Sequence, residues 1–197
     1  IHIPHELSGT YQSAVNAAKR VENTKINVVD GLSASVGLGL IVMKAAYLAK
    51  ASKNYEEISA VLPEIISQSN VYLLVKDLSY IVKGGRLPGW VKKIADFLHI
   101  RPVLSTKENG SLGANGIIRG TFNLPEKMSK YVLTKLDANK SYNISIGHCN
   151  TLENGEKLME LIQKGHNKIN SIYLMDIGCA LGVHAGPESL AVAIQPV

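Results

Sequence analysis

Short apolar runs, most of them rich in β-branched or aromatic residues, recur along the chain and predict β-strands. After residue 70 these runs cover 71–75, 102–105, 116–119, 142–146, 171–175 and 191–194. The second and third runs flank Asn109-Gly110, a dipeptide typical of a β-hairpin turn. An earlier run, 25–30, ends in Asp30 and predicts a parallel strand.

Between these runs, apolar residues recur at intervals of three and four, which predicts helices with one apolar face. The expected helices begin near residue 10 and then cover about 33–52, 54–69, 78–82, 88–98, 125–136 and 154–165. The helix over 33–52 is apolar on most sides, so we expect it to be buried or to line a cavity. The apolar face of the helix over 88–98 consists of Trp90, Ile94, Phe97 and Leu98.

The order of these elements predicts an α/β fold with two domains. Strands alternate with helices in residues 1–70, which is typical of βα units in a parallel sheet covered by helices. Only two strands are expected there, too few for a sheet, so we expect this first domain to be incomplete in the sequence. Residues 71–197 predict a second domain, a mixed sheet with helices on one face.

Composition limits the class of protein. Apolar residues make up 46% of the 197 residues and charged residues 19%, which is typical of a folded chain. There is no run of 18 apolar residues, so no transmembrane helix is expected, and no signal peptide is visible. Cys149 and Cys179 form no CxxC motif and lie in apolar surroundings. We expect buried, reduced thiols and a cytoplasmic protein.

The net charge of +5 comes from the middle of the sequence. Residues 71–130 hold ten Lys or Arg against four Asp or Glu, whereas the flanking thirds hold six against six and five against six. This excess indicates an anionic partner: an acidic protein, a phosphorylated ligand or a membrane surface. We do not expect nucleic acid, because the basic residues are scattered and Phe and Trp total three.

The stretch Leu7-Ser8-Gly9-Thr10-Tyr11-Gln12-Ser13-Ala14 marks the turn into the first helix. Ser8 or Thr10 can cap the helix, and Gly9 allows a ligand to approach the backbone. Free amides and the positive end of a helix attract a carboxylate or phosphate. The alternative is that the stretch is only a well-capped helix.

Two later stretches complete a pattern. One is Lys83-Gly84-Gly85-Arg86-Leu87, followed by Leu98 to Leu104 and Asn109-Gly110. The other is Ile177-Gly178-Cys179-Ala180-Leu181-Gly182-Val183-His184-Ala185-Gly186-Pro187. Together with LSGTYQSA, in this order and over nearly the whole chain, they resemble the DegV family of bacterial lipid-binding proteins.

The resemblance implies a two-domain α/β protein that encloses one long-chain fatty acid. Some members are similar to the binding subunit of bacterial fatty acid kinase, which presents the acyl carboxylate to a separate kinase. Family members carry further βα units and a Thr-Ser-rich loop before the LSGT stretch. We expect that portion to be missing from the sequence rather than from the protein.

The resemblance also implies ligand-binding residues. The family uses the histidine that corresponds to His184 to bind the carboxylate, and the glycines around it, Gly186 among them, would let a loop press the imidazole against the ligand. The alternative is a structural loop histidine. The family pattern has glycine where Glu188 stands here, and a carboxylate at that place would repel an acid unless it points away.

The departure at Pro4 and His5 affects the second half of the expected site. Many members carry two serines there, one of which contacts the carboxylate. His5 could replace the serine as a donor, the head group could shift toward Ser8, or His5 could be an exposed turn residue. Ser8, Gly9 and Thr10 are carried over as the loop that forms the site wall.

Basic residues near the glycine pair are candidates for docking a partner. Lys83, Arg86 and Arg101 could meet phosphate or an acidic surface, or could form internal ion pairs, for instance with Asp77 or Asp96. Asp30 at a strand end either belongs to a site or caps the next helix. His148 beside Cys149 is too small a cluster for zinc, and no metal site is expected.

The leading hypothesis is therefore a binding protein without cofactor or catalytic residues of its own. No Ser-His-Asp spacing, carboxylate pair or P-loop is present in the sequence. The rival is an enzyme similar to the substrate-binding part of dihydroxyacetone kinase, in which His184 or His5 would form a covalent adduct with a small carbonyl substrate. That hypothesis rests on fold analogy.

Overall fold

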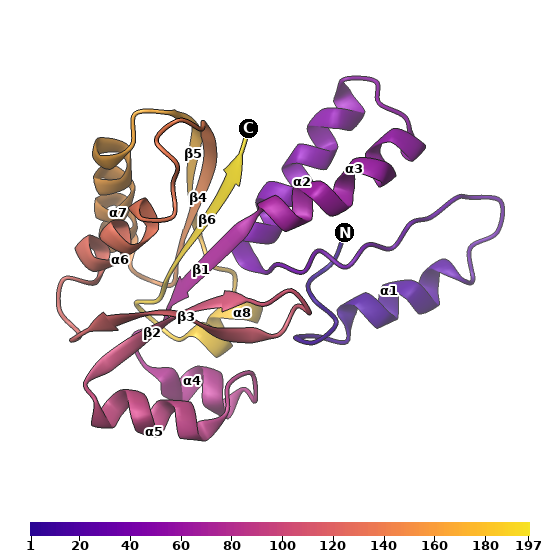
Figure 1. The fold of residues 1–197 in the computed structure, drawn as a ribbon. Coiled ribbons are helices and arrows are strands. Elements are labelled where there is room, and N and C mark those ends of the chain that lie inside the picture. Colours follow the sequence, from indigo (N-terminus) through magenta and orange to yellow (C-terminus); the bar gives the residue numbers. More distant parts are fainter.

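The centre of the molecule is a mixed sheet of six strands in the order β3-β2-β1-β6-β4-β5, seen in a computed structural model that describes residues 1–197 (Figure 1). The strands are β1 (Asn70–Leu74), β2 (Ile100–Thr106), β3 (Leu112–Arg119), β4 (Tyr142–His148), β5 (Ile169–Asp176) and β6 (Leu190–Pro196). Only β4 and β5 pair in parallel, and every other neighbouring pair is antiparallel. The predicted α/β class with a mixed sheet is confirmed.

Eight helices surround this sheet. They are α1 (Thr10–Ala18), α2 (Ser35–Lys50), α3 (Tyr55–Gln68), α4 (Leu78–Lys83), α5 (Gly89–Phe97), α6 (Leu124–Leu133), α7 (Leu152–Gly165) and α8 (Cys179–Ala185). Seven of them follow the predicted periodicity, whereas α8 occupies the stretch that we expected to be a loop. None of the eight is long and apolar enough to cross a membrane.

Helices cover both faces of the sheet, so the prediction of helices on one face is wrong. Along β1, Tyr72 and Leu74 point into the core under α6 and α7, while Val71 and Leu73 point to the opposite face. On that opposite face α2 packs through Val36 and Leu40, and α4 and α5 form a neighbouring cluster. Because β1 is apolar at consecutive positions, both of its faces can be buried.

Local sequence signals explain several element boundaries. The Asn54 side chain accepts a hydrogen bond from the Glu57 amide at 2.9 Å while Glu57 accepts one from the Asn54 amide, which is a capping box for α3. Asp77 caps α4 by accepting from the Ser79 amide at 2.8 Å. Between β2 and β3, Gly110 has a φ of +84°, which a glycine adopts without strain.

The strand predicted over 25–30 does not form. The segment makes only one parallel bridge, between Asp30 and His2, supported by a hydrogen bond from the His2 amide to the Val29 carbonyl at 2.9 Å. A strand needs neighbours for its backbone groups, and no further strand of residues 1–70 lies beside it. A helix satisfies its own backbone, so α1 forms in the same region.

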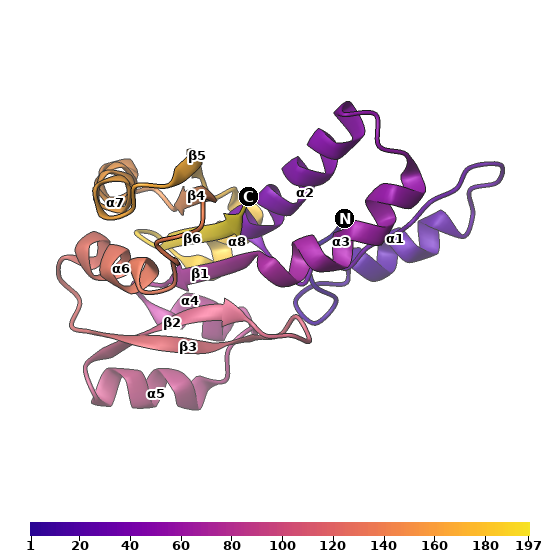
Figure 2. The same cartoon turned by 45° about the horizontal axis from the view of Figure 1, so that its top comes forward.

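Residues 1–30 contribute one buried side chain, Pro4. Figure 2 shows α1 and the loop after it extending away from the sheet, whereas α2 reaches back to it.

The helix over 88–98 is also oriented against expectation. Val91 and Ala95 of α5 face the core, and its apolar stripe is exposed, with Trp90 at 63% and Phe97 at 83%. The domain boundary near residue 70 stays a prediction.

Candidate functional site

A cavity of about 430 Å³ lies on the face of the sheet that carries α2, α4 and α8. Fourteen of its 21 lining residues are hydrophobic. Strand residues Val71, Leu73 and Ala191 form its floor, and helices and the N-terminal segment form its walls. The volume and the apolar lining are those of a small-molecule site.

A second recess of about 380 Å³ adjoins this cavity and is polar. The two share the lining residues Leu7, Ser8, Arg86 and Leu112. The recess adds mainly polar and glycine residues, namely His5, Glu6, Gly9, Gly85 and Ser111. An apolar chamber with a polar mouth can hold an amphipathic molecule in one orientation.

His184 lines the apolar cavity from α8. The expectation of a loop at this position is wrong, because residues 179–185 are helical despite Gly182, and Gly186 at a φ of +74° ends the helix. The Nδ1 atom of His184 is buried and has no hydrogen-bond partner. The imidazole as a whole is half-buried and borders the cavity, so its other nitrogen is the one that a ligand there can reach.

Arg86 stands at the border between cavity and recess. Its Nε and Nη2 atoms donate to the Leu7 carbonyl at 3.3 and 3.2 Å, and Nη1 donates to the Gly84 carbonyl at 2.5 Å. The guanidinium thus connects the end of α4 to the loop before α1. The same charged group lies between the apolar and the polar space.

The loop carried over from the LSGT stretch forms part of the site wall. Ser8 and Thr10 line the apolar cavity, and their hydroxyls lie 2.8 Å apart in a hydrogen bond. Ser8 Oγ also accepts from the Thr10 amide at 3.3 Å. The residue that precedes the first helical turn is Gly9, which offers no side-chain cap, and nothing lies within 4 Å of where its Cβ would be.

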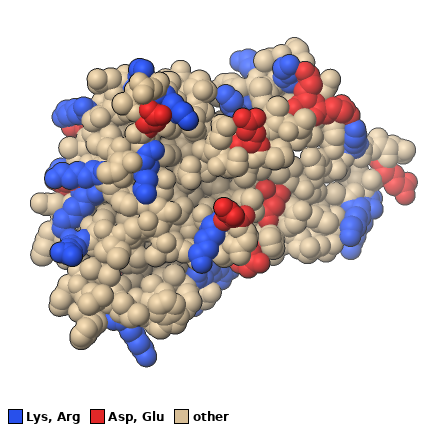
Figure 3. All heavy atoms as spheres, in the orientation of Figure 1, with Lys and Arg blue, Asp and Glu red and all other residues tan.

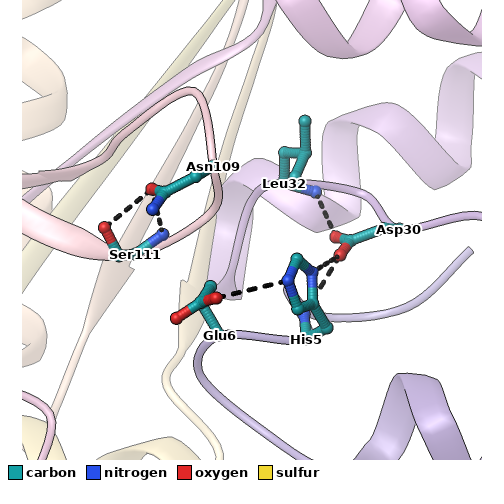
Figure 4. A network of polar contacts seen from close by, with 6 residues as sticks. All are labelled: His5, Glu6, Asp30, Leu32, Asn109 and Ser111. Atoms are coloured by element: carbon teal, nitrogen blue, oxygen red, sulfur yellow. Dashed lines mark hydrogen bonds and ion pairs between the residues drawn. The ribbon is translucent and has the colours of Figure 1, made fainter.

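His5 lines the polar recess and is held by two carboxylates (Figure 4). Its Nδ1 lies 2.6 Å from Asp30 Oδ2, and Nε2 lies 3.3 Å from Glu6 Oε1. The hydrogen bond to Asp30 raises the pKa of His5 against the opposing effect of burial, and the charges of Asp30 and Glu6 add to the rise. Burial acts to raise the pKa of Asp30, but hydrogen bonds from His5 and Leu32 outweigh it and lower that pKa.

Gly186 and Glu188, which follow His184 in the sequence, shape its surroundings without lining the cavity. A Cβ on Gly186 would lie 2.5 Å from the Tyr80 ring, so the glycine lets α8 end against α4. Glu188 has a φ of +60°, a conformation that favours glycine, which matches the glycine of the family pattern at this place. Its carboxylate points away from the cavity and pairs with Lys76.

The three basic candidates differ in their surroundings. Lys83 and Arg86 are exposed at the end of α4. The Arg101 side chain is 16% exposed, lies 3.3 Å from Asp96 and donates to the Lys76 and Ile100 carbonyls. The internal alternative that the sequence left open is therefore the one found for Arg101. On the face seen in Figure 3, Lys and Arg are spread among uncharged atoms.

The cysteines and His148 lie apart from this arrangement. Cys149 is half-buried, and burial, with the charge of Asp176 second, raises the pKa of its thiol. Cys179 is exposed, so the expectation that both thiols are buried is wrong for it. His148 is 3% exposed with Nδ1 3.3 Å from Asp176. No group of three His, Cys, Asp or Glu side chains could hold a metal ion.

Sequence reasoning missed several polar members of the wall. Ser35 begins α2, and Ser105 and Thr106 end β2, all three lining the apolar cavity. A hydroxyl at a strand end or helix start carries no sequence signal for a ligand, because such residues are common in turns and caps.

Comparison with known proteins places the fold. The chain matches the DegV family of uncharacterised proteins over residues 1–197. It is 31% identical to a DegV domain-containing protein of Clostridium perfringens, covering 99% of this chain and 69% of that one.

Solved structures give the same result. A DegV family protein from Thermus thermophilus, described as binding fatty acid, is 25% identical with a TM-score of 0.89, covering 100% of this chain and 70% of that one. A fatty acid binding DegV family protein from Streptococcus agalactiae is also 25% identical with a TM-score of 0.84, covering 99% and 68%. The family match over the full chain and the curated relative together show that this chain belongs to the DegV family.

Proposed function

We propose that this protein binds a long-chain fatty acid, with the acyl chain in the apolar cavity and the carboxylate at the polar recess. The observation that carries the proposal is the pair of adjoining spaces, one apolar and one polar, that share Ser8 and Arg86. Related DegV proteins of Thermus thermophilus and Streptococcus agalactiae are described as fatty acid binding, which supports the same ligand class.

Burial of the acyl chain dominates the affinity. About fourteen methylenes at about 0.8 kcal/mol each give roughly 11 kcal/mol before the cost of immobilising the ligand. The polar groups then set orientation, because a carboxylate can accept hydrogen bonds from His184, Arg86 or the Ser8 hydroxyl. Ser8 takes over from the family's serine in this arrangement, since His5 is already engaged by Asp30.

The test is to extract lipid from mildly purified protein and to titrate it with a fluorescent fatty acid. We expect one fatty acid per chain, and His184→Ala should weaken binding about tenfold, as for a lost hydrogen bond to a charged group. Leu73→Asp, on the cavity floor, should abolish binding, while Val183→Asp, on the 65%-exposed side of the same helix as His184, should not. Lack of binding by the folded wild-type protein would refute the proposal.

A finer part of the proposal is presentation of the carboxylate to a separate kinase in the cytoplasm, with the protein as an accessory subunit and not an independent enzyme. Because the acyl chain is buried, a partner must dock near the polar recess, where Arg86 is exposed and from which Lys83, in the last turn of α4, is three residues away along the chain. We expect Lys83→Ala to slow association with an acidic partner surface and to reduce its salt dependence, with fatty acid affinity unchanged. Arg101→Ala would act through stability instead, since its guanidinium pairs with Asp96.

The rival enzyme hypothesis predicts a different result at the same residues. A covalent adduct on His184 or His5 after incubation with dihydroxyacetone and a reductant, seen by mass spectrometry, would favour it. The apolar lining of the cavity favours an acyl chain over a small polar ketone.

A further inference from the structure

We propose that Gly84 is a positioning residue for His184: the absence of a side chain at Gly84 provides the space that the imidazole occupies. This inference rests on the proposed function only in its consequence for fatty acid binding. The packing between the two residues is a property of the protein without ligand. The contact brings together two sequence motifs that lie one hundred residues apart, at 84 and 184.

The contact is tight and specific. A Cβ added to Gly84 would overlap His184 Nδ1 and lie 2.9 Å from Cε1 and 3.3 Å from Cγ. Real Cβ atoms do not approach other atoms that closely, so alanine at this position requires the imidazole or the end of α4 to move. The Gly84 backbone itself has a φ of −70°, which any residue adopts. The reason for glycine here is therefore the neighbouring ring and not the turn.

The backbone around Gly84 has little freedom to yield. Its carbonyl accepts from Arg86 Nη1 at 2.5 Å, and its amide donates to the Tyr80 carbonyl at 2.9 Å. On the other side, Gly186 places the end of α8 against the Tyr80 ring. Since both helix ends are fixed, the imidazole is the group that a side chain at position 84 would displace.

The contact also determines which nitrogen of His184 can act. Nδ1 is sealed against Gly84 and has no hydrogen-bond partner. Nε2 is the remaining ring nitrogen, and His184 lines the cavity, so Nε2 is the atom that a ligand reaches. Displacing the ring from Gly84 would remove that donor from the place where the head group lies.

A double-mutant cycle tests the packing without any ligand. Gly84→Ala should lower the thermal unfolding midpoint when His184 is present and should have little effect in a His184→Ala background, where the ring is gone. The ¹⁵N shifts of the His184 imidazole should also change in Gly84→Ala. The matched control is Gly89→Ala, whose added Cβ would meet only Val82 Cγ1 at 3.7 Å. It should not lower the midpoint, since alanine favours a helix over glycine, and it should leave the imidazole shifts unchanged.

Titration with a fluorescent fatty acid then tests the consequence. Gly84→Ala should weaken binding as much as His184→Ala, about tenfold, and the double variant should be no weaker than either. Equal destabilisation by Gly84→Ala in both backgrounds, or wild-type affinity in Gly84→Ala where His184→Ala loses it, would overturn the proposal. If the wild-type protein binds no fatty acid, the proposed function fails, and the cycle of unfolding midpoints still decides the role of Gly84.

Discussion

The sheet with its helices and the first thirty residues are stabilised in different ways. Every strand of the sheet except the edge strand β5 contributes buried side chains, and β4 residues Ile144 and Ile146 are fully buried. Residues 1–30 bury only Pro4, and α1 has no buried residue at all. The sheet and its helices are held by their own core, whereas residues 1–30 depend on a few contacts to the rest of the molecule.

Several of the contacts of residues 1–30 are at the candidate site. Arg86 donates to the Leu7 carbonyl and the hairpin tip at Gly110 lies against Pro4, while His5 and Asp30 are bonded to each other within residues 1–30. Away from the site, Lys25 pairs with Glu56 and Asn27 donates to Ser59, both on α3. The part of the chain with the least core therefore forms one wall of the cavity. A wall of low local stability is suited to opening for a ligand, since binding loops are drawn from the less stable parts of a fold.

The largest effect expected from this comparison is in the core. Ile146→Ala should lower the free energy of unfolding by about 3 to 4 kcal/mol, because a fully buried side chain loses both its transfer free energy and its packing. Val21→Ala, at a side chain that is 47% exposed, should change it by no more than about 0.5 kcal/mol. Chemical denaturation measures both. Similar losses in the two variants would mean that residues 1–30 are part of the cooperative core.

The next effect concerns the attachment of the N-terminal wall. Arg86→Ala removes two hydrogen bonds to the Leu7 carbonyl and one to the Gly84 carbonyl. We expect amide exchange at Leu7 and Ser8, which donate to the Pro4 carbonyl, to accelerate about tenfold while β4 amides keep their protection. Arg86→Lys should behave like alanine, because lysine lacks the guanidinium fork. Slower exchange at Leu7, or equal acceleration in β4, would contradict this.

Elements whose sequence pattern is local were predicted well. The strands from β1 to β6 and the Asn109-Gly110 hairpin follow from short apolar runs and a turn dipeptide, and the structure has them. The run over 25–30 has the same composition as a strand and fails, because pairing depends on neighbours that the run itself does not specify. Helix α8 was missed because three glycines in the surrounding stretch suggested a loop.

The site was predicted unevenly for the same reason. His184, Ser8, Thr10 and Arg86 line the cavity, and Ser8, Gly9, His5 and Arg86 line the recess. Their proximity depends on how α4, α8 and the N-terminal loop pack, which no single stretch encodes. The link between Gly84 and His184 is entirely tertiary. The inward or outward orientation of α5 was not predictable either, since Val91 and Ala95 are a weaker apolar signal than Trp90 and Phe97.

A smaller effect on stability is expected at Glu188, just after α8. Glu188 holds a φ of +60°, which costs a non-glycine residue about 1 kcal/mol, and its exposed ion pair with Lys76 offsets at most part of that. Glu188→Gly should therefore stabilise the protein by about 0.5 kcal/mol in thermal or chemical unfolding. Lys76→Met, which removes the ion pair and keeps the backbone strain, should not stabilise it. Destabilisation by Glu188→Gly would show that the ion pair outweighs the strain.

The smallest effect is a pH dependence confined to the N-terminal wall. The pKa of His5 is raised above its usual 6.5, so its contribution is complete below pH 6.5 and is lost as the pH rises through the raised pKa. The pKa of Asp30 is lowered below its usual 3.8, so its contribution is complete above pH 3.8 and is lost as the pH falls through the lowered pKa. The pair should therefore protect the His5 amide most between pH 3.8 and 6.5, because that amide donates to Asp30 Oδ2.

Amide exchange of His5, corrected for its intrinsic pH dependence, measures this protection. His5→Gln should remove the loss on the alkaline side, and Asp30→Asn should remove it on both sides. Glu6→Gln should shift the alkaline limb only slightly, since the hydrogen bond to Asp30 is the larger cause of the raised pKa of His5. Protection that stays flat from pH 3 to 9 in the wild-type protein would mean that the His5–Asp30 bond does not order this segment.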